Sequence, residues 1–115
     1  MKKVGQLEET VRVVDVMNAS GVKLNVITFS ALISACEKAG NVEETLRVFD
    51  EMNASGVKPD VITFNALISA CGKAEQREEA LRVFDVMNAS GVKPDEITYG
   101  SLIFALGKAP KTEEV

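Results

Sequence analysis

The chain has 115 residues, of which 46% are hydrophobic and 26% are charged, and its net charge is −4. This composition indicates one globular domain and excludes a disordered segment, and no apolar run approaches the roughly 20 residues that a membrane-spanning helix needs. The absence of histidine excludes histidine-based catalysis and histidine metal sites, and the acidic balance argues against a general polyanion binder.

Residues 1–25 contain one predicted helix, near residues 7–20. This helix ends in the phrase MNASGVK at residues 17–23. The segment before it carries acidic residues early. It has neither the apolar core of a signal peptide nor the Arg/Ser-rich composition of a transit peptide. We therefore expect no targeting segment in this chain.

The next 35 residues, 26–60, form a unit of two predicted helices, near residues 26–38 and 42–54, and end in the same phrase. Residues 61–95 repeat this unit with 28 of 35 positions identical. Self-similarity at a fixed interval of this length predicts a solenoid, in which each unit packs on its neighbours. Identity this high fits either a recent duplication or an engineered array.

The second unit supplies predicted helices near residues 61–73 and 77–89. Apolar residues spaced three and four apart form one stripe on each helix. The first stripe is Phe64, Leu67, Ile68 and Cys71. The second stripe is Ala80, Leu81, Phe84 and Met87. Asp60 is the expected N-cap of the first helix, and Gly56 and Gly91 are expected left-handed C-cap residues.

Residues 96–115 begin a further unit, with a predicted helix near residues 96–108. Phe104 and Leu106 make this helix more apolar than its counterparts, although no following helix covers it. The six helices together predict an all-α fold, a short right-handed α-solenoid of stacked helix-turn-helix repeats. Its uncovered ends would either stack against another copy or continue into a longer array.

The two cysteines, Cys36 and Cys71, lie 35 residues apart in the same slot of the repeat, and Leu106 fills that slot in the last unit. A position that accepts Cys or Leu is most simply a small buried apolar site. We therefore expect neither a disulfide nor a ligand role for these thiols.

The 35-residue units resemble the pentatricopeptide repeat family of P type over essentially the whole chain. The resemblance is carried by VITFNALISACGKA, by REEALRVFDVMNASGVKPD and by the Pro-Asp pair that closes a unit. The tetratricopeptide repeat is the nearest confusable family. It runs at 34 residues with a Trp/Leu-Gly/Tyr pattern that is absent here.

This resemblance implies a protein that binds single-stranded RNA, with one base per repeat. The family reads bases with the fifth and last residue of each unit, here Ser30, Asp60, Asn65, Asp95, Gly100 and Asn25. By resemblance, Ser with Asp prefers guanine and Asn with Asp prefers uracil. Gly100 and Asn25 each lack the other half of a pair, so the implied message is 5′-GU-3′.

Two further sets of residues take roles by the same resemblance. The second residue of each unit would stack between bases, at Ile27, Ile62 and Ile97. A lysine at the end of each first helix would contact phosphate, at Lys38, Lys73 and Lys108. Each set also has a structural explanation, because Asp60 and Asp95 can cap helices, isoleucine can pack and lysine suits a helix C-terminus.

The resemblance implies that the first helices of the units form the RNA-binding layer, and charge placement partly answers the objection from the acidic net charge. The complete second helices, 42–54 and 77–89, hold seven acidic residues against three basic ones. The first helices hold only Glu37 and Glu96 against three lysines. Local potential decides binding at contact distance in salt, so this layer can bind RNA despite the net charge.

The leading interpretation is a single-stranded RNA-binding module that is not an enzyme and needs no cofactor or metal. The alternative is a helical scaffold that binds proteins or assembles with itself, as a homo-oligomer, through its terminal helices. No membrane contact is expected. The family resemblance implies a mitochondrial or chloroplast location and a role in organellar RNA processing.

Overall fold

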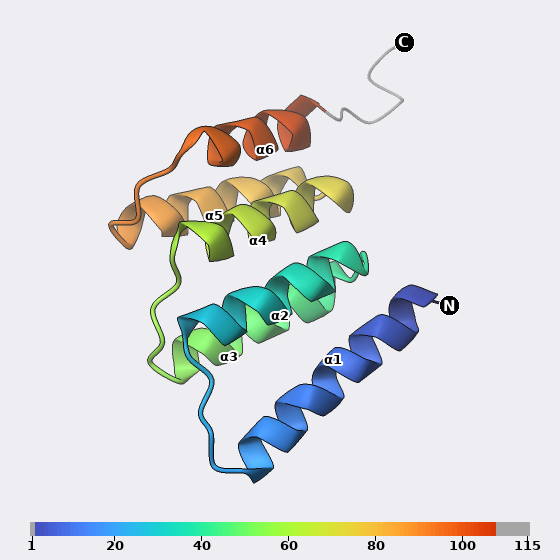
Figure 1. The fold of residues 1–115 in the computed structure, drawn as a ribbon. Helices are drawn as coiled ribbons and strands as arrows, with labels where there is room; N and C mark the ends of the chain where they lie inside the picture. Colours follow the sequence, from blue (N-terminus) through green and yellow to red (C-terminus); the bar gives the residue numbers. More distant parts are fainter. Residues whose placement is uncertain (1, 108–115) are drawn as a thin grey trace.

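The computed structural model describes residues 2–107, and these fold into α-helices without any strand among them (Figure 1). The helices are α1 (Lys2–Ala19), α2 (Val26–Lys38), α3 (Val42–Ala54), α4 (Val61–Lys73), α5 (Arg77–Ala89) and α6 (Glu96–Gly107). The predicted all-α repeat is confirmed, and the bounds of α2 to α5 match the prediction. Within residues 2–107, no helix has the length and apolarity to cross a membrane.

The prediction was wrong at the start of α1, which begins at Lys2 rather than near residue 7. In the later units a loop precedes the corresponding acidic first turn, as residues 39–41 do before α3. The segment Lys-Lys-Val-Gly-Gln contains no proline and three good helix formers, so nothing stops the helix at the alignment boundary.

The helices form two layers, the leading helices (α2, α4 and α6) and the trailing helices (α1, α3 and α5). Each leading helix packs on the next, α2 on α4 and α4 on α6. Helix α3 packs between α2 and α4, and α5 packs between α4 and α6, whereas α1 packs on α2 alone among the described helices. Figure 1 shows this order, with α1 set apart at one end and α6 at the other.

The repeated phrase MNASGVK contains the end of a trailing helix and the first residues of the loop to the next leading helix. Gly56 and Gly91 adopt φ angles of +80° and +81°, as predicted for left-handed C-cap residues. Asp60 then caps α4, because its Oδ1 accepts a hydrogen bond of 3.1 Å from the backbone N–H of Thr63. The chain therefore turns at the same place in each unit, which fixes where the start of each leading helix lies.

The core lies between the two layers. All four residues of the stripe predicted on α4 are fully buried. The rings of Phe49 in α3 and Phe64 in α4 meet edge to face, with centroids 5.7 Å apart. The stripe predicted on α5 is partly wrong, because Leu81 is exposed and Val83 is buried in its place. Ala80, Val83 and Met87 share the side of α5 that meets the leading helices, and the three-and-four spacing also fits this set.

Cys36 and Cys71 are free thiols without solvent exposure, in the apolar environment that the sequence predicts. Burial raises the pKa of both thiols to about 11. They pack as small apolar side chains and are protonated at neutral pH.

One turn carries backbone strain that the equivalent turn avoids. Gly40 follows α2 with φ +75°, and the aligned residue after α4 is Glu75, with φ +61°. Both residues donate the same backbone hydrogen bond, Gly40 to Glu37 and Glu75 to Gly72, each 3.0 Å long. The turn is thus conserved in geometry while the second unit places a residue with a Cβ in the left-handed region.

We predict that Glu75→Gly stabilises the protein by about 0.5–1 kcal/mol. The left-handed conformation costs a residue with a Cβ about 1–2 kcal/mol, and glycine avoids this cost. Because glycine loses more backbone entropy on folding, the net stabilisation is smaller than the cost avoided. Chemical denaturation measures the difference. Glu75→Ala is the matched control, because it removes the carboxylate but keeps the strain. Equal stabilisation by both variants would assign the effect to the carboxylate rather than to the backbone.

Candidate nucleic-acid interface

The second residue of each unit is an exposed isoleucine at the start of a leading helix. Ile27, Ile62 and Ile97 are 73%, 58% and 61% exposed. Packing in the core therefore does not explain them. We call these three residues the isoleucine row; they occupy the same helical position on three helices that pack in order.

An open hollow of about 240 Å³ lies between the first two members of the row. It is lined by Ile27, Ser30, Ala31, Ser34, Asp60 and Ile62. The structure thus brings together two predicted stacking residues and the complete predicted reading pair of the first unit. The walls are mainly apolar, and the polar groups come from Ser30, Ser34 and Asp60.

Ser30 is buried at the interface between α2 and α4. Its Oγ lies 2.6 Å from Oγ1 of Thr63 and 3.5 Å from Oδ1 of Asp60. The Thr63 hydroxyl in turn donates a 3.0 Å hydrogen bond to Asp60. When Thr63 donates to Asp60, the Ser30 hydroxyl is the donor to Thr63. The Ser30 oxygen then keeps acceptor capacity only.

Asn65 occupies the equivalent position between α4 and α6. Its Nδ2 donates a 3.1 Å hydrogen bond to Oδ1 of Asp95, and its Oδ1 accepts from the hydroxyl of Thr98. Both ends of the amide are therefore held, which fixes its orientation. One N–H of Asn65 keeps donor capacity that these contacts do not use.

Thr63 and Thr98 are part of the site, although neither was among the predicted site residues. Both are fully buried, and each bonds the fifth residue of the preceding unit and the aspartate that caps its own helix. The available signal was a threonine at the third position of every unit, at residues 28, 63 and 98. It resembled an ordinary helix-start residue, because its partner lies more than 30 residues away in the sequence.

The two incomplete reading pairs lie at opposite ends of the molecule. Asn25 caps α2, where its Oδ1 accepts from the backbone N–H of Thr28 and its own N–H donates to the Thr28 hydroxyl. Gly100 is exposed on α6. No second reading residue faces either of them within residues 2–107.

The predicted phosphate-contacting lysines have different surroundings. Lys38 is exposed at the end of α2. Lys73 pairs with the carboxylate of Glu37, which also accepts a 3.0 Å hydrogen bond from Ser69. Lys108 lies outside the described residues. One of the two described lysines is thus partly neutralised by an acid on the same layer.

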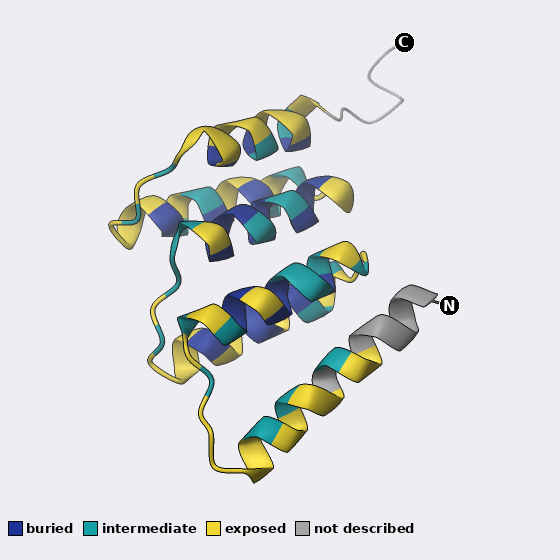
Figure 2. Ribbon diagram, viewed as in Figure 1, coloured by how far each residue is buried: buried dark blue, intermediate teal, exposed yellow. Residues whose placement is uncertain are grey.

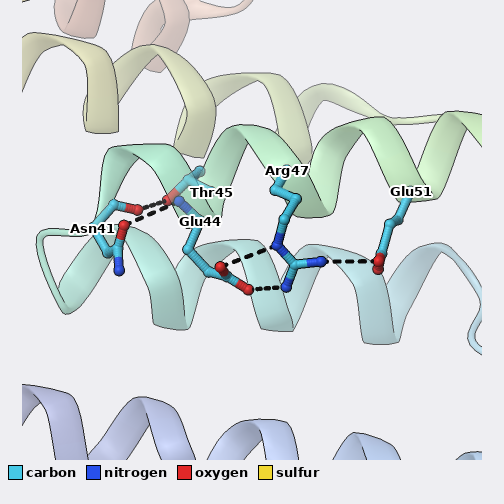
Figure 3. Close-up of polar contacts among 5 residues, drawn as sticks. All are labelled: Asn41, Glu44, Thr45, Arg47 and Glu51. Carbon is cyan, nitrogen blue, oxygen red and sulfur yellow. Dashed lines mark hydrogen bonds and ion pairs between the residues drawn. The ribbon is translucent and has the colours of Figure 1, made fainter.

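Arginines on α3 and α5 pair with glutamates of their own helix. On α3, Arg47 bonds Glu44 on one side and Glu51 on the other, the latter at 2.9 Å (Figure 3). Asn41 caps this helix through the backbone N–H of Glu44, at 3.0 Å. These charges lie on the trailing helices, whereas the isoleucine row lies on the leading helices.

Hydrogen bonding keeps Asp95 ionised. The backbone N–H of Thr98 is the main cause of a lowered pKa at this carboxylate, and the Asn65 amide adds to it. Among residues 2–107, no three His, Cys, Asp or Glu side chains come together as metal ligands would. The arrangement can offer flat apolar surface and oriented hydrogen-bonding groups.

Comparison with known proteins gave matches to pentatricopeptide repeat proteins. A profile of the pentatricopeptide repeat domain matches residues 12–74 and 47–109. The chain is similar to the pentatricopeptide repeat protein PPR10 in complex with an 18-nt psaJ RNA element, with 40% identity and a TM-score of 0.77 over 84% of this chain. It is also similar to PPR10 from maize, with 33% identity and a TM-score of 0.79 over 92% of this chain. The chain spans only 14–15% of those chains. No curated protein matched it.

We predict that Asn65→Ala raises the pKa of Asp95, because the carboxylate loses one of its hydrogen bonds. Its stabilising bonds are present while it is ionised and are lost as the pH falls through the lowered pKa. Carboxyl ¹³C shifts followed through an acid titration measure this midpoint. Asn88→Ala, an exposed asparagine on α5, is the control and should leave the midpoint unchanged. An unchanged midpoint in Asn65→Ala would mean that the contact with Asp95 is not formed in solution.

Proposed function

This chain belongs to the pentatricopeptide repeat family, and from that premise we propose that it binds single-stranded RNA, with one base per repeat and without catalysis. In this proposal the complete units are residues 26–60 and 61–95, of P type. The partial units are residues 1–25 and 96–115. The PPR10–RNA complex supports the class of ligand, and the geometry of the isoleucine row supports the place where RNA binds.

The observation that carries the proposal is the hollow between Ile27 and Ile62. A base inserted there would lie against an exposed apolar side chain on each side and face Ser30 and Asp60. Two isoleucines exposed by more than half would otherwise present apolar surface to water. Stacking of this kind accepts any base, so selectivity must come from the polar groups.

The unused hydrogen-bonding groups of Ser30 and Asp60 favour guanine in this hollow. The hydroxyls of Ser30 and Thr63 share one hydrogen bond, and each can donate to Asp60. In either arrangement the Ser30 proton is used within this cluster, so Ser30 offers an acceptor, as does the carboxylate of Asp60. The Watson–Crick edge of guanine presents two adjacent N–H donors. Two acceptors on the protein therefore complement guanine and do not complement an edge rich in acceptors.

The unused hydrogen-bonding groups of Asn65 and Asp95 favour uracil in the second unit. The Asn65 carbonyl is used by Thr98, so the amide offers an N–H donor, while Asp95 offers a carboxylate acceptor. Uracil presents an N–H donor flanked by carbonyl acceptors. The change from serine to asparagine thus replaces an acceptor with a donor at the fifth position, which supports the reading 5′-GU-3′.

The affinity of one chain should be low. Base stacking on a protein contributes about 1–3 kcal/mol per base. Two or three bases then give a gross ~3–6 kcal/mol before ordering costs, which corresponds to millimolar or high-micromolar binding. A Kd in this range is measured best by NMR.

We predict that Ser30→Asn changes the preferred dinucleotide from GU to UU. The substitution gives the first unit the reading pair of the second, in an environment that is otherwise nearly identical. Titration of an isotope-labelled sample with short single-stranded RNA at low salt, followed by backbone amide shifts, measures the preference. Native protein should bind GU several-fold more tightly than UU, and the variant should reverse that order.

Oligo-A is the control ligand for both proteins. Shifts should be largest near Ile27, Ser30, Ile62 and Asn65. Saturating RNA without shifts at these residues would refute binding at the isoleucine row. Unchanged base preference in Ser30→Asn, with shifts at the expected residues, would refute only the assignment of the reading pairs.

We predict that Glu37→Gln strengthens RNA binding several-fold at low salt. The variant releases Lys73 to contact phosphate and keeps an acceptor for Ser69. One added phosphate contact should steepen the dependence of log K on log salt by about 0.7. Glu43→Gln on α3 makes the same change in net charge on the other layer. Equal effects of the two variants would assign the gain to net charge rather than to Lys73.

A further inference from the structure

An apolar groove of about 360 Å³ runs between α1 and α2. Its lining includes Val13, Val14, Met17, Ala31, Leu32 and Ala35. Val13 is 66% exposed, and most of the described surface of α1 is open to solvent (Figure 2). Helix α1 packs on α2 alone among the described helices.

The chain itself shows what fills a groove of this kind. Because the repeat is 35 residues long, the space between α3 and α4 is the equivalent of the α1–α2 groove in the next unit. The residues that correspond to Val13, Met17 and Ala35 are Val48, Met52 and Ala70, and these are 2%, 0% and 5% exposed. They are buried because α2, a leading helix, packs against α3 and α4.

At the other end of the described residues, α6 is a leading helix whose outward side no described helix covers. Ile103 on α6 is 70% exposed and Tyr99 is 50% exposed. Their counterparts on α2 are Ile33 and Phe29, which are 0% and 3% exposed because α3 and α4 cover them. Helix α6 thus exposes the side that a leading helix buries in such a groove.

We propose that copies of this chain stack head to tail, with α6 of one copy in the α1–α2 groove of the next. The contact repeats the internal packing of α2 against α3 and α4. It is heterologous, since the two surfaces differ, so it leads to open chains of copies rather than to closed dimers.

The side chains at the two ends are compatible with this contact. Where α2 has Cys36, α6 has the larger Leu106, and where α3 has Phe49, α1 has the smaller Val14. The larger side chain on α6 compensates for the smaller one on α1, so the total volume at the contact stays similar and the interface can be filled. Gly107 stands in the slot of Glu37, so no acidic side chain from that slot enters the contact.

The stack also completes a unit across two copies. Helix α6 supplies its leading helix, and α1 of the next copy supplies its trailing helix. Gly100 would then face Asn25 of the next copy, as Ser30 faces Asp60 within one chain. This last step rests on the proposed RNA binding, whereas the stacking itself does not require RNA.

Sedimentation of the whole chain without RNA tests the stacking. The weight-average mass should rise with concentration above the 12.4 kDa of one copy and should change little with salt. Ile103→Glu destroys the α6 surface, and Val13→Glu destroys the groove. Each variant alone should remain at the mass of one copy. An equimolar mixture should give a dimer, because one intact surface of each kind remains.

Leu81→Glu on α5 is the matched control, since it places the same charge on an exposed apolar position away from both ends. It should associate like the native chain, and circular dichroism checks that all variants are folded. A native chain that stays at 12.4 kDa at every concentration would overturn the proposal. So would self-association of Val13→Glu alone, which would indicate an α6-to-α6 contact. RNA binding by a strictly monomeric chain would leave the proposed function standing while the stacking fails.

Discussion

The packing of one leading helix on the next is the interaction on which the rest of this structure depends. Together with the trailing helices, it buries Ile33, Phe64 and Ile68 without any remaining exposure. It also brings Ser30 to Thr63 and Asn65 to Thr98. Each candidate base site is therefore a property of two docked repeats. A repeat alone would expose its apolar stripe and would hold only half of a site, which is the general behaviour of solenoid units.

Small sequence differences adjust this contact without changing the fold. The interface between α2 and α4 carries Glu37 with Ser69 and Lys73. The interface between α4 and α6 instead has Gly72, where a Cβ would lie 3.1 Å from that of Ala105. One interface is closed by polar contacts, and the other by close approach of the backbones. Glu37 at the first interface also pairs with Lys73, on the proposed RNA-binding layer.

The dependence on docked neighbours connects the two proposals. The internal leading helix α4 is covered on both sides, and the two proposed reading pairs beside it, Ser30 with Asp60 and Asn65 with Asp95, have both members present. Within the described residues, α1 and α6 are covered on one side, and Asn25 and Gly100 have no opposite member. A head-to-tail contact would bury the exposed apolar surface and complete a reading pair at once. The two effects have one cause, because α6 carries both the exposed apolar residues and Gly100.

The sequence by itself determined the local structure, because caps, turns and apolar spacing act within a few residues. The bounds of α2 to α5, the Asp60 cap and the glycine turns all belong to this class, as does the burial of Cys36 and Cys71. Tertiary structure decided which side of α5 is buried, how Lys73 is paired and which groups of Ser30 and Asn65 are used. Those outcomes depend on side chains more than 30 residues away, such as Thr63, Thr98 and Glu37. The spacing of a repeat predicts that such residues meet, but only the docked helices fix their distances and hydrogen bonds.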